Sequence, residues 1–402
     1  MFPWFKRLID LTLLVLTLGL GAVAVGAVGR EAPVDTVGAP SSTATVDRLA
    51  FRTGDWLDTS DRDVVLAAYV DAFSADVADL DWTGDHDACD GGDSSAAVRR
   101  VTIDRVNYYR AMAGVPAVIT ERDEFNDKAR AAAIMMSVEG SLTHSPGADF
   151  SCHTDAGAEG AANANLYLGR TGPDAIDGYI EDPGEKNTDV GHRNTILHPP
   201  TRWMGSGDVG AGEGAHASNA LWVFDEHVFD ETSPARPAVR EPERFVAWPP
   251  RGYVPADLVH PRWSLMVAEA DFSVAEVTMH HLTADGPASV GLTIVDRVGA
   301  PGHVPLPAVV WEPELDLSGG HSVDQVFLVV VDGVRPMVHI GPETASPFDA
   351  GLAAPSELGP PTRFAYVVRV LGDAPARAGL GVAPELAGDQ QPVEDILATL
   401  GY

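Results

Sequence analysis

The spacing of apolar residues divides the chain into a part with helical periodicity and a part with strand periodicity. Up to about residue 230, apolar residues recur every three or four positions, as Val98, Val101 and Val106 do, which is the pattern of a helix with one buried face. After about residue 233 the period drops to two, as in residues 274–279, which is typical of half-buried strands. The pattern therefore predicts helices with a small antiparallel sheet, followed by an all-β region.

Stop and start signals set the ends of the predicted elements. Gly114-Val115-Pro116 ends one helix and Pro199-Pro200 ends another, because neither glycine nor proline continues a helix well. The predicted helices cover residues 60–77, 98–109, 125–140, 171–180, 189–197 and, near the C-terminus, 393–400. The predicted strands lie around 203–209, 220–224, 274–279, 290–294, 326–331 and 363–370.

The first 29 residues carry the pattern of an export segment. Lys6 and Arg7 precede an apolar run that closes on small residues suited to a cleavage site, at 22–24 or 25–27. The alternative is an uncleaved membrane anchor, since the run is nearly long enough to span a bilayer. Either interpretation places the remaining chain outside the cytoplasm, secreted or held by this segment, and predicts no other membrane contact.

The charge of the chain excludes one large class of partners. Its 402 residues hold 27 basic and 58 acidic side chains, a formal net charge of −31. A surface this negative repels a phosphate backbone, so no nucleic acid is expected as a partner. The sequence also lacks Gly-x-Ser-x-Gly, His-Glu-x-x-His and a phosphate-binding glycine loop, which weakens serine-hydrolase, zincin and nucleotide-binding interpretations.

The chain has two cysteines, Cys89 and Cys152. An oxidising compartment favours a disulfide between them, and their spacing matches no zinc cluster. Aspartates crowd the sequence around Cys89, and we interpret this stretch as a solvated loop rather than a calcium site, because its spacing is not that of an EF-hand loop.

Four short segments carry the most specific signal in the chain. They are Asn-Tyr-Tyr-Arg at 107–110, Leu-Thr-His-Ser-Pro at 142–146, Asn-Leu at 165–166 and Gly-His-Arg-Asn-Thr-Ile-Leu at 191–197. In this order and spacing they resemble the CAP superfamily (cysteine-rich secretory proteins, antigen 5 and pathogenesis-related 1 proteins), in its bacterial SCP-like branch. Asp-Pro-Gly-Glu-Lys-Asn at 182–187 is similar to one bacterial subgroup, in which cysteines at the places of Cys89 and Cys152 are usual.

The resemblance implies a fold and a domain organisation. It implies an α-β-α sandwich, and the β-rich part resembles the immunoglobulin-like β-sandwich extensions that follow some bacterial CAP domains. The expected class is thus α+β. The predicted parts are an export segment or anchor (1–29), a linker (30–59), an N-terminal helical extension (60–97), a CAP domain (98–232), a β-sandwich domain (240–373) and a C-terminal tail (374–402).

The resemblance also implies a cleft with two histidines and, in many members, two acids. By motif position His144 and His192 match the histidines and Asp182 matches one acid, with Arg193 beside His192. The other acid normally precedes the Asn-Leu pair, where this sequence has Ala164. Glu159 lies nearby in sequence, but no motif supports it as a substitute.

Three interpretations of this reduced set stay open. His144, Asp182 and His192 are residue types that bind a divalent metal such as zinc with water in the fourth position, and histidines also serve as acid and base near neutral pH. The structural interpretation, in which the two histidines fix loops and helix ends, is favoured over metal binding, and metal binding over catalysis. No residue is assigned a catalytic role, and the matching motifs hold no serine or cysteine nucleophile.

The sequence therefore predicts a secreted CAP-domain protein that binds an extracellular ligand, a lipid or an envelope component. The alternatives are a metal-dependent extracellular hydrolase acting on peptides and an inert structural or adhesion component of the envelope. Enzymatic activity is the less favoured interpretation, and no cofactor other than the divalent metal is expected.

Overall fold

The computed structural model describes residues 56–73, 79–226, 245–299, 306–317, 323–339, 356–372 and 393–400. These residues all belong to one compact unit, Asp47–Tyr402. The predicted export segment and most of the predicted linker after it lie outside the described residues, as do residues 227–244 between the predicted domains.

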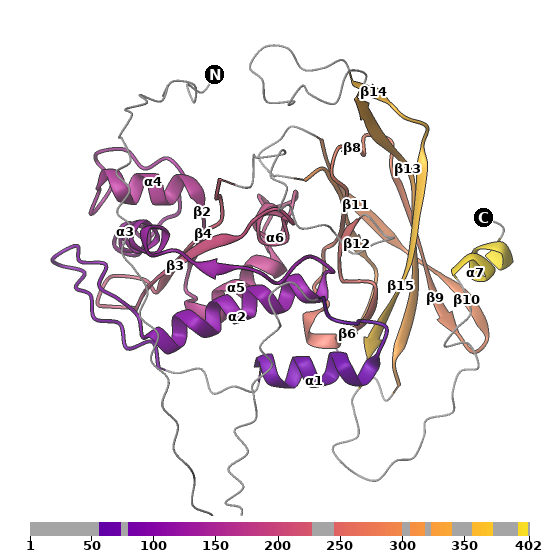
Figure 1. Cartoon of the computed structure of the whole chain (residues 1–402), viewed down its shortest axis with the longest axis horizontal. Coiled ribbons are helices and arrows are strands. Elements are labelled where there is room, and N and C mark those ends of the chain that lie inside the picture. Colours follow the sequence, from indigo (N-terminus) through magenta and orange to yellow (C-terminus); the bar gives the residue numbers. More distant parts are fainter. Residues whose placement is uncertain are drawn as a thin grey trace, which may run out of the picture. The chain divides into compact units, whose positions relative to one another are not determined.

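The first half of the described chain forms three layers, with a four-stranded sheet between two layers of helices (Figure 1). The strand order is β1-β3-β4-β2, with β1 parallel to β3 and the other pairs antiparallel. The elements are α1 (Arg62–Phe73), α2 (Ala96–Met112), β1 (Thr120–Glu121), α3 (Asp123–Glu139), α4 (Asp155–Asn163), β2 (Ala164–Leu168), α5 (Gly172–Glu181), α6 (Gly191–Ile196), β3 (Trp203–Val209) and β4 (Ser218–Trp222).

Strand β2 shows how the sheet separates the two helical layers. Ala164 and Leu166 belong to the apolar cluster formed with α3 and α4. The alternate residues face the other layer, where the Asn165 carbonyl accepts a hydrogen bond from Tyr179 of α5 and Tyr167 stacks edge-on against the same ring. Successive strand residues point to opposite faces, so β2 contributes an apolar residue to one layer and a polar residue to the other in turn.

Glycines allow helix α3 to lie very close to strand β3. A Cβ at Gly207 would lie 2.2 Å from the Arg130 nitrogen and 2.3 Å from the Ala129 carbonyl carbon, and one at Gly205 would lie 2.5 Å from the Asn126 nitrogen. Every one of these atoms belongs to the backbone of α3, so no side-chain movement makes room. The two glycines thus define the contact on one face of the sheet.

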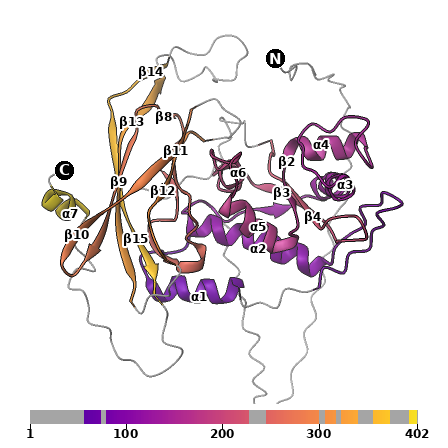
Figure 2. The same cartoon turned by 180° about the vertical axis from the view of Figure 1, so that it is seen from behind.

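The second half of the described chain is built from two sheets (Figure 2). One sheet runs β10-β9-β13-β15-β6, with β8 and β14 also pairing with β13, and the other runs β11-β12-β7-β5. The strands are β5 (Val246–Trp248), β6 (Gly252–Pro255), β7 (Trp263–Met266), β8 (Ala270–Asp271), β9 (Glu276–Thr283), β10 (Gly286–Val290), β11 (Leu292–Val298), β12 (Ala308–Pro313), β13 (Gln325–His339), β14 (Ser356–Leu358) and β15 (Thr362–Leu371), and the helices are the 3-10 turn η1 (Ala256–Leu258) and α7 (Val393–Leu400).

Strand β13 is buried on both faces, which explains the continuous apolar run in its sequence. Phe327 and Val329 belong to the main core, whereas Leu328 and Val330 lie on the opposite face in a small cluster with Leu397 of α7. Because α7 covers the outer face of this strand, both faces of β13 are buried. The run that the sequence analysis assigned to a central strand is indeed central, and the helix predicted at 393–400 is confirmed.

The expected fold class is confirmed, with differences in single elements. The helix predicted at 60–77 runs from Arg62 to Phe73, and residues 74–78 lie outside the described part. Helix α4 and strand β2 were not predicted, because the sequence from 155 to 168 is rich in glycine and alanine and shows little periodicity. The tryptophans Trp248 and Trp263 are buried in the core.

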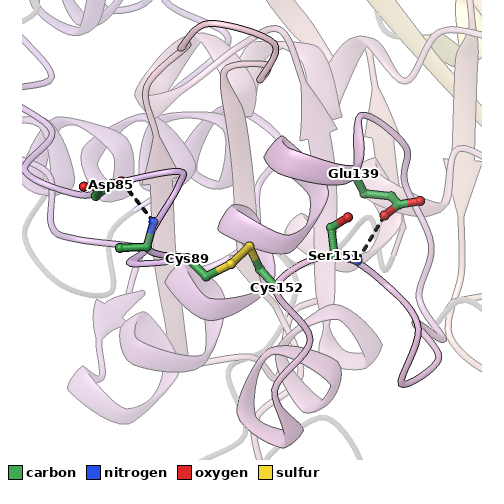
Figure 3. The surroundings of a disulfide bond; sticks show 6 residues. Asp85, Cys89, Glu139, Ser151 and Cys152 are labelled. Atoms are coloured by element: carbon green, nitrogen blue, oxygen red, sulfur yellow. Dashed lines mark hydrogen bonds between the residues drawn. A yellow bond between two sulfur atoms is a disulfide. The ribbon is translucent and has the colours of Figure 1, made fainter.

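The predicted disulfide joins Cys89 and Cys152 (Figure 3). Both residues lie in loops, and each loop is held by a carboxylate: Asp85 Oδ1 accepts a hydrogen bond from the Ala88 amide, and Glu139 accepts one from the Ser151 amide. The bond closes a sequence separation of 63 residues and ties the loop before α2 to the segment after α3.

Candidate functional site

Asp182 and His192 form the centre of the candidate site. Asp182 ends helix α5 in the left-handed conformation, with φ of 52°, and its side chain is fully buried. Its Oδ1 accepts a hydrogen bond of 2.7 Å from His192 Nδ1, and its Oδ2 accepts bonds from the backbone amides of His192 and Arg193. One carboxylate therefore holds the first turn of α6 and the imidazole ring that this turn carries.

The charge state of His192 follows from this contact. Burial acts to lower the pKa of His192, but the hydrogen bond and negative charge of Asp182, with a further contribution from Asp189, outweigh it and raise the pKa above 6.5. The ring is 23% exposed. Because Nδ1 is occupied by Asp182, Nε2 is the nitrogen left for a ligand.

A second set of contacts fixes the backbone of His192. Asn165 of β2 donates from Nδ2 to the His192 carbonyl and accepts a bond from the Thr195 hydroxyl. The hydroxyl of Tyr179 binds the Asn165 carbonyl, and its ring lies 5.4 Å from that of His192. The Asn-Leu motif and the Gly-His-Arg motif are thus joined directly, which the sequence indicated only through their recurrence in one family.

His144 lies apart from the Asp182–His192 pair. It is exposed, and its Nδ1 lies 2.8 Å from the Ala161 carbonyl of α4. Among the described residues it makes no hydrogen bond to Asp182 or His192. Both histidines nevertheless contact the short segment formed by the end of α4 and the start of β2, through Ala161 and Asn165.

The structure supplies no second acid at the positions considered. Ala164 is buried in the cluster of α3 and α4. The Glu159 carboxylate binds the ammonium group of Lys128 at 2.9 Å, which forms an ion pair between helices α4 and α3.

The geometry does not favour the metal-binding alternative for His144, Asp182 and His192. Across the described ranges, no group of three or more His, Cys, Asp or Glu side chains is placed to hold a metal ion. In the expected set, Asp182 already accepts three N–H bonds and His144 makes no contact with the pair. These residues do not fit a zinc centre.

The expectation that Arg193 lines the cleft is also corrected. Its side chain is fully buried, and burial lowers its pKa to about 10. The guanidinium donates to the carbonyls of Ile180 and Glu181 and to the hydroxyl of Ser264 in β7. Arg193 thus joins the helical layers to the β-rich region. The sequence did not predict this role, because Ser264 lies 71 residues away along the chain.

Two neighbouring cavities lie in this part of the molecule, the smaller between helices α2 and α5 and the β-rich region, and the larger within the β-rich region. One, of about 370 Å³, is lined among others by Tyr109, Asp177 and Glu181, and the other, of about 570 Å³, by apolar residues that include Trp263. His260 lines both, and its Nε2 is buried without a hydrogen-bond partner. Burial and the nearby Arg193 and Arg170 lower the pKa of His260 to about 3.

This histidine makes the stability of the fold sensitive to acid. Unfolded His260 takes up a proton near pH 6.5 and folded His260 only near pH 3. Between these values the unfolded state binds more protons, so the stability of the fold decreases as the pH is lowered. From pH 6.5 to 5, we expect the unfolding free energy to drop by about 2 kcal/mol more in the native chain than in His260→Gln. Denaturant unfolding followed by tryptophan fluorescence measures this difference, and equal pH dependences would contradict the burial effect.

The fold and the site together define a class of protein. A sheet of order β1-β3-β4-β2 lies between helices, and a histidine at the start of α6 is held by the acid that ends α5. This is the α-β-α architecture with a histidine site that the four motifs implied.

The comparison with protein families identifies that class. Residues 103–225 match the model of the cysteine-rich secretory protein family, CAP. Residues 103–225 therefore form a CAP domain, and a β-rich region follows it in the chain. No curated protein matches the chain significantly.

Family and disulfide are consistent with a protein that works outside the cytoplasm. Within the described ranges, no helix has the length and apolar character needed to cross a membrane.

Proposed function

We propose that this chain is a non-enzymatic extracellular binding protein whose CAP domain binds its partner at the surface around His192 and His144. The observation that carries this proposal is the Asp182–His192 pair. The carboxylate is buried and accepts three N–H bonds, while the imidazole stays partly exposed. A polar group that is already fixed loses little entropy on binding, which favours affinity.

Binding requires less of this site than a reaction does. A hydrolase needs a nucleophile, a metal-activated water or a second acid–base group. The place of the second acid is Ala164, Glu159 binds Lys128, and no described group of side chains fits a metal. What remains is one oriented imidazole with a free nitrogen, which suffices to bind an oxygen acceptor of a ligand.

The raised pKa of His192 indicates the chemistry of that ligand. The ring keeps its proton to a higher pH than an ordinary histidine, and in this state Nε2 donates a hydrogen bond. An acceptor oxygen, such as a carboxylate or carbonyl group of an envelope component, suits the protonated ring.

Binding to isolated cell envelopes of the organism that makes the chain tests this proposal. We expect His192→Gln to weaken binding by roughly tenfold, the equivalent of one good hydrogen bond. His281→Gln, on strand β9 of the β-rich region, is the matched control and should bind like the native chain. Equal binding by the native chain and His192→Gln would place the binding surface elsewhere.

Hydrolysis of fluorescein-labelled casein, with and without added zinc, tests the competing activity. The proposal expects no cleavage that depends on His192. Cleavage that is lost in His192→Gln would instead identify a hydrolase.

A further inference from the structure

The loop between α5 and α6, residues 182–190, has a conformation that needs support from outside. Asp182 and Val190, at its two ends, have φ values of 52° and 48°. The left-handed region is unfavourable for residues other than glycine, particularly for a β-branched one. Because this loop carries Asp182 and leads into His192, whatever holds the loop also holds the site.

Arg262, directly before strand β7, makes the main contacts with this loop. Its Nη1 donates to three loop carbonyls, those of Asp182 at 3.1 Å, Gly184 at 2.7 Å and Asn187 at 2.9 Å. Its Nε donates to Glu312 of β12 at 3.0 Å. The guanidinium is planar and rigid, so the bond to Glu312 sets the direction in which Nη1 meets the loop.

Asp182 links Arg262 to His192. Its carbonyl accepts a hydrogen bond from Arg262, and its carboxylate binds the ring and the amide of His192. The β-rich region makes further contacts here: Thr188 in the loop donates to Asp296 of β11, and the side chain of Asn194 in α6 forms two hydrogen bonds with the Leu306 backbone.

We propose that Arg262 is a positioning residue for the Asp182–His192 pair, and that the β-rich region thereby sets the geometry of the CAP site. That this geometry serves partner binding rests on the proposed function, whereas the positions of Asp182 and His192 can be measured without any ligand. Arg262 suits a test better than Arg193 does, since the fully buried Arg193 is part of the core and its loss threatens folding.

Nuclear magnetic resonance on the full-length chain tests the proposal. In Arg262→Ala, we expect the His192 Nδ1 proton to lose its downfield position and the His192 and Arg193 amides to exchange roughly ten- to a hundredfold faster. Arg262→Lys should restore part of the amide protection, because an ammonium group still donates to the loop carbonyls.

The matched control is Arg62→Ala, which removes the ion pair between helix α1 and Asp324 and leaves the loop contacts in place. It should leave both signals of His192 unchanged. Unchanged His192 signals in a folded Arg262→Ala chain would overturn the proposal, as would an equal effect of Arg62→Ala. If His192→Gln binds envelopes normally while Arg262→Ala shifts the His192 signals, the proposed function fails and the positioning role stands.

Discussion

Replacing Arg110 by methionine is expected to lower the unfolding free energy by roughly 4 kcal/mol or more. Arg110 lies in helix α2, its side chain is fully buried, and burial lowers its pKa to about 9. Its five N–H groups meet five backbone carbonyls, at distances from 2.7 to 3.2 Å. The acceptors are the carbonyls of Pro116, Ile196, His198, Pro199 and Thr201.

The size of the effect follows from these carbonyls. Methionine fills much of the volume but removes the arginine donor from all five carbonyls, of which that of His198 keeps a backbone partner, the Thr201 amide. Each buried group left unpaired costs about 1–3 kcal/mol. Arg110→Lys has three donors, so its loss should be intermediate. Urea unfolding of both variants measures the order, and a methionine variant as stable as the native chain would show that the buried charge costs as much as its bonds contribute.

The second large effect is expected from the disulfide. Replacing Cys89 and Cys152 by serine opens a closure of 63 residues, and the chain-entropy relation assigns about 4 kcal/mol to a loop of that length. Unfolding in denaturant should therefore begin at clearly lower concentration in the double variant. The loops that hold the two cysteines are expected to lose protection against hydrogen exchange first, since the bond fixes them directly.

A reductant provides the control for this experiment. The native chain treated with reductant should unfold like the double serine variant, and the same treatment should leave that variant unchanged. If reduction does not alter the stability of the native chain, the loops are held by their carboxylate contacts and the disulfide adds little.

The architecture was predictable wherever a local pattern decided it. Helix α6 and strand β3 follow from spacing and stop signals, and strand β13 follows from a run that is apolar on both faces. Helix α4 was missed because small residues carry little periodicity, although Thr154 caps its first turn by accepting a bond from the Gly157 amide. That cap and the acidic Asp155 in the first turn were the local signals for this helix.

The site was predictable in its residues but not in their roles. Motif position identified Asp182 and His192, and the structure brings them into contact. The same motif suggested that Arg193 lines a cleft, whereas its guanidinium turns toward Ser264. The role of Arg262 was not predictable from its neighbours in sequence, because its loop acceptors lie 75 to 80 residues earlier in the chain and Glu312 lies 50 residues later. Such contacts become visible only when the chain is folded.

The loop held by Arg262 also makes the site accessible to chemical labelling. The chain has only three lysines, Lys6, Lys128 and Lys186. Lys128 is engaged with Glu124 and Glu159, whereas Lys186 is exposed in the same loop, four residues after Asp182. Among the lysines of the described residues, an amine-directed cross-linker therefore reacts chiefly in the loop between Asp182 and helix α6. The scarcity of lysine supplies a natural attachment point for capturing a partner at the proposed binding surface, without introducing any new residue.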